Sequence, residues 1–197
     1  SQSAVRAKSV STGKLATPGN IVGDPTSGVC GQTYQYSISS LANATLGYSW
    51  TIPAGATIIG PSNSNSITLQ FPANFVSGVL SVAGVNSCGV GYARSINVYG
   101  NPATPGAISG NASVCAGSQE MYTWAPVPGT TYYQIQAPVG ATILSGNITT
   151  NTFVLIQWGT TGGNIGVKAV NGCGVSGTRT FAASIACRTA AEQSMTD

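Results

Sequence analysis

The chain of 197 residues carries few charges and no histidine, which narrows the functions open to it. Charged residues make up 6% of the sequence, against about 25% in ordinary soluble domains, and the basic ones form no cluster that would mark a nucleic-acid surface. Without histidine the usual general base is missing, and four Asp and Glu residues are too few for a carboxylate-rich calcium cage. We therefore expect no catalytic residue, cofactor or metal, and no apolar run is long enough to insert into a membrane.

An internal repeat organises the chain from one end to the other. "PAGATI" at Pro53–Ile58 returns as "PVGATI" at Pro138–Ile143, and "NSCG" at Asn86–Gly89 returns as "NGCG" at Asn171–Gly174, both 85 positions later. Such self-similarity is typical of tandem modules. We divide the sequence into a remnant strand of a preceding repeat, two repeats and a C-terminal linker, at 1–16, 17–101, 104–186 and 187–197.

Apolar residues alternate with polar ones along the repeat. In chain order the first repeat shows this period of two in "TYQYSIS" at 33–39, "YSWTI" at 48–52, "SITLQF" at 66–71 and "GVLSVAGV" at 78–85. Short alternating segments separated by Gly, Pro and Asn predict antiparallel strands with one buried face. About seven strands in such a length predict an immunoglobulin-like β-sandwich in each repeat, and hence an all-β protein.

The motifs of the first repeat resemble a known family. The run Y-x-W-x-x-P-x-G-A-T-I, followed by "SIT" and "SGVLSVAGVNSCGVG" at 77–91, resembles the PKD-like repeats of secreted and surface proteins in Bacteroidota. The resemblance implies the sandwich fold, export, and a place upstream of a type IX secretion sorting domain. The second repeat departs from the pattern, because Ile135 replaces Trp50 and "FVLIQW" at Phe153–Trp158 carries an insertion.

The five cysteines are expected to form structural disulfides, and two pairings are open. Cys30 to Cys88 and Cys115 to Cys173 would be intradomain bonds of equal spacing. However, Cys30 precedes the second strand of its sandwich and Cys88 follows the sixth, so they fall at opposite poles. A seven-residue strand spans about 23 Å, while a disulfide needs Cα atoms within about 7 Å.

A staggered pairing avoids this difficulty, and we prefer it. Cys30 would bond to Cys173 of the following repeat, and Cys115 would take Cys187, just past the last strand, as a substitute partner. Cys88 would stay unpaired because its partner would lie in a preceding repeat. The intradomain pairing remains the alternative.

Aromatic and arginine side chains supply the remaining candidates. Trp50 and Trp158 are expected in the cores of their sandwiches, and Arg94 and Arg179 are expected to bind loop carbonyls. Four further rings are clustered in the second repeat and offer a possible ligand-binding face if they are exposed, since an aromatic face suits stacking on a sugar ring: Tyr122, Trp124, Tyr132 and Tyr133. Packing in the core or against the linker is the preferred interpretation of Trp124.

We expect the chain to act without catalysis, as tandem spacer or adhesion modules of an exported cell-surface or secreted protein. Its expected partners are neighbouring domains of the same chain, and no nucleic acid. The alternative is a binding module for a polysaccharide or another surface protein, using the exposed aromatic residues of the second repeat.

Overall fold

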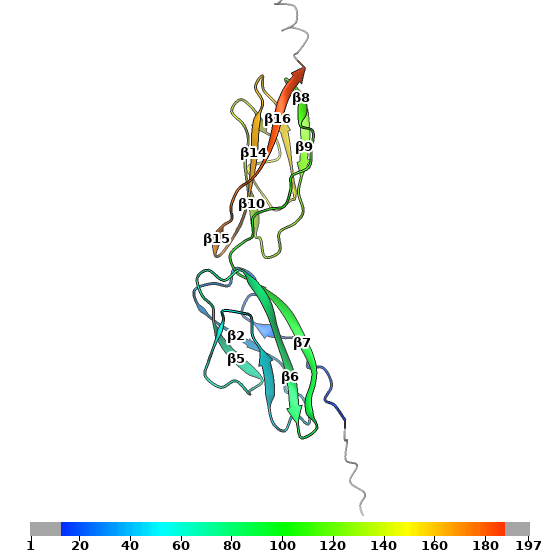
Figure 1. Cartoon of the computed structure of the whole chain (residues 1–197), viewed down its shortest axis with the longest axis vertical. Helices are drawn as coiled ribbons and strands as arrows, with labels where there is room; N and C mark the ends of the chain where they lie inside the picture. The colour runs from blue at the N-terminus through cyan, green and yellow to red at the C-terminus, as the bar shows by residue number, and fades with distance from the viewer. Residues whose placement is uncertain (1–12, 188–197) are drawn as a thin grey trace, which may run out of the picture. The chain divides into compact units, whose positions relative to one another are not determined.

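The computed structural model describes residues 13–187 and is built from strands alone in that range, which confirms the predicted all-β fold (Figure 1). The remnant strand predicted at 1–16 and the linker predicted at 187–197 fall almost entirely outside the described residues. Within the described range there is no helix of the length and apolarity that a membrane span requires.

Seven strands make up the first repeat and form two antiparallel sheets. They are β1 Val22–Gly23, β2 Thr33–Ser37, β3 Tyr48–Thr51, β4 Thr57–Ile59, β5 Ser66–Gln70, β6 Ser77–Asn86 and β7 Gly89–Tyr99. One sheet has the order β1-β2-β5-β4 and the other the order β3-β6-β7. Figure 1 shows β6 and β7 as the longest arrows of this repeat, joined by a tight turn.

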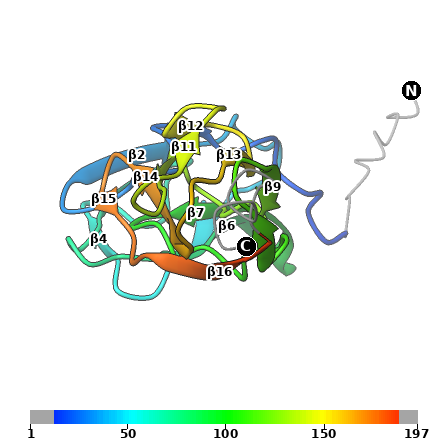
Figure 2. The same ribbon diagram turned by 90° about the horizontal axis from the view of Figure 1, so that it is seen from above.

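The second repeat has the same central strands, with three short strands added to its large sheet, one of them parallel to its neighbour. Its strands are β8 Ser113–Cys115, β9 Gln119–Thr123, β10 Tyr132–Gln136, β11 Thr142–Ile143, β12 Ile148–Thr149, β13 Phe153–Gln157, β14 Gly163–Asn171, β15 Gly174–Val175 and β16 Arg179–Cys187. The small sheet runs β11-β13-β9 and the large one β12-β10-β14-β16-β8, with β15 paired to β14. Figure 2 shows β13 and β16 in separate layers of this sandwich.

Strand register shows that the pair β3 and β6 of the first repeat is equivalent to the pair β10 and β14 of the second. Trp50 of β3 pairs with Val82 of β6, and Ile135 of β10 pairs with Val167 of β14, each 85 positions later. The sequence repeat is therefore a structural repeat with the same strand partners. The turns after β6 and β14 hold the two copies of the cysteine motif.

The described chain divides into two compact units whose borders differ from those of the repeats. The first unit comprises 13–24, Thr33–Gln70 and Val79–Asn97. The second comprises Pro25–Gln32, Phe71–Gly78 and everything from Val98 to the end of the described range. Several loops of the first repeat thus belong to the same compact unit as the whole second repeat.

Alternating strands place apolar side chains inside each unit. In the second unit a single cluster contains Ile108, Val114, Tyr122, Trp124, Val127, Tyr133, Ile135, Val154, Ile156, Trp158, Ile165, Val167, Ala169 and Ala183. Trp158 is buried there, as predicted. In the first unit the largest fully buried side chains are Tyr36, Ile67, Leu69 and Leu80.

Trp50 does not have the fully buried position expected of it. The ring is half-buried, and its indole N–H donates to the carbonyl oxygen of Ser64 over 2.8 Å. The strand face was predicted correctly, but β3 has only four residues at the margin of its sheet. The smaller Ile135 at the equivalent position is buried.

Candidate functional site

The structure contains two disulfides and one free cysteine. Cys30, in the loop before β2, is bonded to Cys173, in the turn after β14, with Cα atoms 5.9 Å apart. Cys115 and Cys187 are register partners in the parallel strands β8 and β16, and their Cα atoms are 4.7 Å apart. Cys88 is free and exposed. These pairs are those of the staggered arrangement, and Cys187 is the last residue of β16 instead of lying past it.

Asn171 fastens the turn that carries Cys173. Its side-chain oxygen accepts the backbone N–H of Cys173 over 2.9 Å, and its amide nitrogen donates to the carbonyls of Gly100 and Gly129 over 2.8 and 2.9 Å. The side chain is 8% exposed, and a buried amide must be hydrogen-bonded to avoid a desolvation cost. Asn171 therefore anchors the turn to two segments of the second unit.

Close backbone approach accompanies the Cys30–Cys173 bond. Gly28 has a φ of 71°, and a Cβ on it would lie 3.2 Å from the backbone nitrogen of Gly172. Glycine adopts this left-handed conformation without the steric cost that other residues incur. The loop before β2 and the turn after β14 are thus fitted to each other as well as cross-linked.

The Cys88 turn repeats this local geometry without the same surroundings. The side-chain oxygen of Asn86 accepts the N–H of Cys88 over 2.9 Å, as Asn171 does for Cys173. Beside Asn86 lies an open hollow of about 290 Å³, lined in part by Lys14 and Leu41. The turn is formed, and its thiol is exposed.

The four aromatic residues proposed as a ligand face do not form one. Tyr122, Trp124 and Tyr133 are 0%, 5% and 4% exposed, and Tyr132 is half-buried. Tyr122, Trp124 and Tyr133 belong to the buried cluster of the second unit. Tyr132 alternates with Tyr133 and lies on the opposite face of β10, so the four rings share no exposed face. The burial of three of these rings contradicts the alternative of an exposed aromatic row, and it agrees with the preferred interpretation of Trp124 as a packing residue.

Hydrogen bonds hold these rings in the core. The Tyr122 hydroxyl donates to the carbonyl of Asn111 over 2.8 Å and accepts the indole N–H of Trp158 over 3.0 Å. Burial raises the pKa of Tyr122, while the bond from Trp158 acts in the opposite direction. The Tyr133 hydroxyl accepts the N–H of Val127 over 2.8 Å. The hydroxyls of Tyr122 and Tyr133 thus tie neighbouring segments to the sandwich.

The two arginines have the structural role predicted for them. Arg94 donates through Nε to the carbonyl of Pro18 over 3.2 Å, and Arg179 donates in the same way to Pro105 over 2.9 Å. Both prolines belong to copies of the sequence "ATPG". Each arginine fastens the segment entering its repeat to the last strand.

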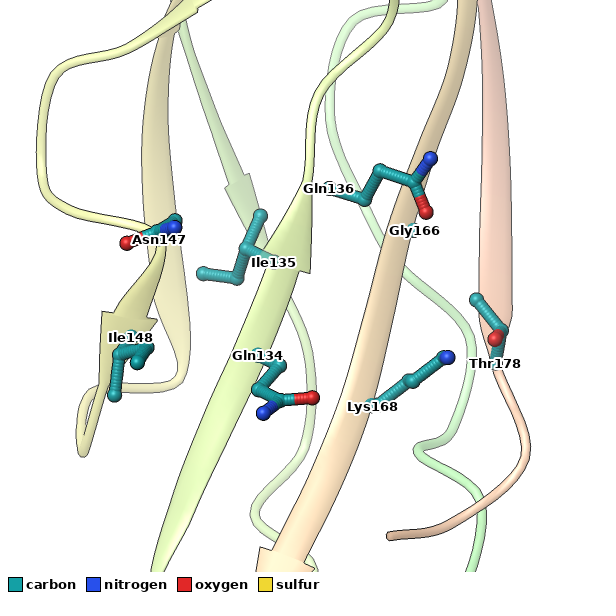
Figure 3. A pocket seen from close by; sticks show the side chains of 8 residues that line it. All are labelled: Gln134, Ile135, Gln136, Asn147, Ile148, Gly166, Lys168 and Thr178. Atoms are coloured by element: carbon teal, nitrogen blue, oxygen red, sulfur yellow. The ribbon is translucent and has the colours of Figure 1, made fainter.

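A polar hollow lies on the outer face of the second repeat (Figure 3). Gln134 and Gln136 of β10 point outward because Ile135 between them is buried and side chains alternate along a strand. Lys168 of β14 is the register partner of Gln134, and Gly166 is the partner of Gln136. Figure 3 shows the Lys168 side chain reaching from β14 toward the strand β16 side.

The hollow has a volume of about 240 Å³ and a glycine in its floor. Asn147 and Ile148 border it at the edge strand β12, and Thr178 borders it at the start of β16. A Cβ on Gly166 would lie 3.1 Å from Cγ2 of Thr178 and 3.6 Å from Cβ of Gln136. The missing side chain leaves the floor open. We call this hollow the Gln–Lys groove.

The residues of the Gln–Lys groove carried no assignment from the sequence. Their one signal is the alternation of Gln134 and Gln136 around Ile135, which marks an outward polar face without saying what gathers there. The first repeat has Ser49, Thr51 and Ala83 at the positions of Gln134, Gln136 and Lys168. The groove is therefore specific to the second repeat. Among residues 13–187 no group of His, Cys, Asp and Glu side chains is arranged to hold a metal ion.

The fold defines the class of the protein as tandem immunoglobulin-like sandwich modules. The sequence matches the model of the PKD-like domain family twice, over residues 14–98 and 101–183. The chain belongs to the PKD-like domain family. Members of such families are typically non-catalytic modules.

Comparison with solved structures returned chains of low sequence identity, and a search of curated proteins found no match. The chicken CNTN1 FN1–FN3 domains are 14% identical over 89% of this chain and 68% of that one, with a TM-score of 0.43. A two-domain fibronectin type III segment of chicken tenascin is 12% identical over 85% and 98%, with a TM-score of 0.35. A glycosyl hydrolase family 2 member from Bacteroides cellulosilyticus is 15% identical over 80% and 23%, with a TM-score of 0.33.

Proposed function

We propose that the chain is a pair of non-catalytic spacer and adhesion modules in an exported bacterial protein of the cell surface or the secreted fraction. The observation that carries the proposal is the Cys30–Cys173 bond, together with the anchoring of Asn171 to Gly100 and Gly129. These contacts make one compact unit out of the second repeat and the end loops of the first. In this function the disulfide links successive modules of one chain covalently, and the hydrogen bonds of Asn171 support that link.

Two observations support an extracellular setting. Disulfides persist in oxidising compartments and are rare in the cytosol, and the structure has two of them. The surface also relies on Ser, Thr and Asn with few ionised groups, so its solubility would depend little on salt. We further propose an origin in Bacteroidota and export by the type IX route, on the resemblance of the repeat motifs.

Surface labelling tests the location. An antibody raised against residues 17–186 should label intact cells of the source organism, or detect the parent protein in the medium. Labelling that appears only after the cells are made permeable would contradict export. A periplasmic marker and a cytosolic marker serve as controls for leakage.

A module exchange tests the spacer role. Replacing residues 17–186 of the parent protein by two unrelated tandem sandwiches of similar length should preserve surface display and the activity of the neighbouring domains. Deleting the same residues without replacement should impair them. Failure of the exchange, with display intact, would show that these modules do more than separate their neighbours.

A further inference from the structure

We propose that the Gln–Lys groove of the second repeat binds an acidic oligosaccharide. In this assignment Lys168 pairs with a sugar carboxylate, and the amides of Gln134 and Gln136 bind ring hydroxyls. The proposal is independent of the spacer role and of the buried aromatic residues.

The polar side chains that line the groove have unused hydrogen-bonding capacity. The side chains of Gln134, Gln136, Asn147, Lys168 and Thr178 have no hydrogen-bond partner among residues 13–187. Three of the five are carboxamides, and each carboxamide offers two donors and an acceptor. Neighbouring hydroxyls on a sugar ring present donors and acceptors side by side, so they match this set. Five such groups line one hollow of about 240 Å³.

Lys168 gives the groove a positive charge. Lys168 is the only ionised side chain lining the groove, and no carboxylate lines it. The nearest cation along the sheet is Arg179, whose Nε is already bound to the carbonyl of Pro105. The acidic residue Glu120 lies on β9, in the other sheet of the sandwich. An anionic group entering the groove therefore meets one available positive charge.

The position of the groove on the sheet disfavours a peptide that binds by strand addition. It lies over the faces of β10 and β14, strands that are hydrogen-bonded on both sides within the sheet. A peptide recognised by strand addition needs a free edge with unpaired backbone groups. The lining supplies side-chain amides, a hydroxyl and one ammonium group, with Ile148 as its apolar border. This chemistry favours a hydroxyl-rich ligand over an extended peptide.

Titration of the purified chain with tetragalacturonate, followed by calorimetry and by NMR shift changes, tests the proposal. Binding is expected at low salt, with shifts confined to β10, β14 and Thr178. Lys168→Gln should weaken it by up to about fivefold, the upper end for an exposed ion pair. Gln134→Ala with Gln136→Ala should weaken it about tenfold through two lost hydrogen bonds. Lys14→Gln makes the same change of net charge outside the groove and should leave affinity unchanged.

Further arms separate the competing explanations. Gly166→Ala fills the floor of the groove, and it should abolish binding in a protein whose melting temperature shows that it is folded. Equal weakening by Lys14→Gln and Lys168→Gln would reduce the binding to non-specific charge and overturn the proposal. So would equal affinity for tetraglutamate, which would indicate an acidic peptide, or equal affinity for neutral maltotetraose. Absence of any shift in the groove with tetragalacturonate at millimolar concentration would also refute it.

Discussion

Two asparagines with the same local role differ in what surrounds them. Asn86 and Asn171 each accept the N–H of the cysteine two positions on. Only Asn171 also donates to two further carbonyls, the buried one of Gly100 and the partly buried one of Gly129. The same residue type in the same turn therefore contributes differently to stability, because burial makes the unmade hydrogen bond costly.

We expect Asn171→Ala to lower the free energy of unfolding by about 2 kcal/mol, since it leaves buried acceptors without donors. Asn86→Ala is the matched control and should cost less than about 1 kcal/mol, because it removes only a turn bond. Urea unfolding of the two variants and the parent chain measures the difference. Equal losses in both variants would show that Asn171 has no anchoring role.

Tyr36 predicts a loss of stability in alkali. Burial raises its pKa to about 12, with the negative charges of Asp24 and Tyr34 adding to the effect. A free tyrosine ionises near pH 10, so above that pH the unfolded chain loses the proton first. The contribution is full below pH 10 and disappears as the pH rises to about 12. Unfolding measured from pH 9 to 12 should show a shallower decline for Tyr36→Phe than for the parent chain.

At the scale of strands and loops, the sequence repeat predicted most of what is found. The alternation of apolar and polar residues correctly predicted β2, β3, β5 and β6. A strand with one buried face shows this alternation in the sequence itself. The groove could not be predicted in this way. Whether Gln134 and Lys168 meet depends on strand register, and whether a hollow opens depends on Gly166 lying beside Thr178. Both are properties of pairs distant in sequence.

The aromatic residues show a second limit of prediction. Alternation places Tyr122 and Tyr133 on one face of their strands, but it does not say which face is covered. In the sequence, the second repeat differs from the first by an insertion near Phe153–Trp158. The residues that distinguish the second repeat in the structure are polar and face outward. The rings of Tyr122 and Tyr133 instead lie in the core, where Tyr122 is hydrogen-bonded to Trp158 and Tyr133 to Val127.

Peptide mapping can test which cysteines are bonded to each other. Trypsin cleaves after Lys14, Arg94, Lys168, Arg179 and Arg188. Without reduction, we expect peptide 15–94 joined to 169–179, and peptide 95–168 joined to 180–188. The intradomain alternative would instead join 95–168 to 169–179 and leave 15–94 alone. Mass spectrometry distinguishes the two patterns directly.

At the scale of the whole molecule, Cys88 is the one free cysteine of the described chain, and it is exposed. We expect the folded, unreduced protein to react with one equivalent of maleimide, because the other four cysteines are in disulfides. Cys88→Ser should abolish labelling and leave the unfolding midpoint unchanged, since an exposed side chain outside any network contributes little. Labelling that persists in this variant would indicate an open disulfide elsewhere.

The same thiol bears on the proposed array. In the second repeat the equivalent position, Cys173, is bonded to the loop before β2 of the preceding repeat. In a longer parent chain we expect Cys88 to be protected from maleimide by the corresponding bond to a module on its N-terminal side. Comparison of the parent protein with the present chain measures this protection.

The Cys30–Cys173 bond also determines how a pull on the ends would pass through the protein. The covalent route from one end to the other enters at Cys30, crosses the sulfur bridge and leaves from Cys173. Residues 31–172, which include β2 to β14 almost entirely, form a closed loop off that route. Tension applied by a flowing medium or a moving cell would bypass these strands. Reduction of Cys30–Cys173 alone would place residues 31–114 in the line of force, because the Cys115–Cys187 bond would still hold 116–186 in a loop off the route. The extensibility of the chain would therefore rise in two steps as its surroundings become more reducing.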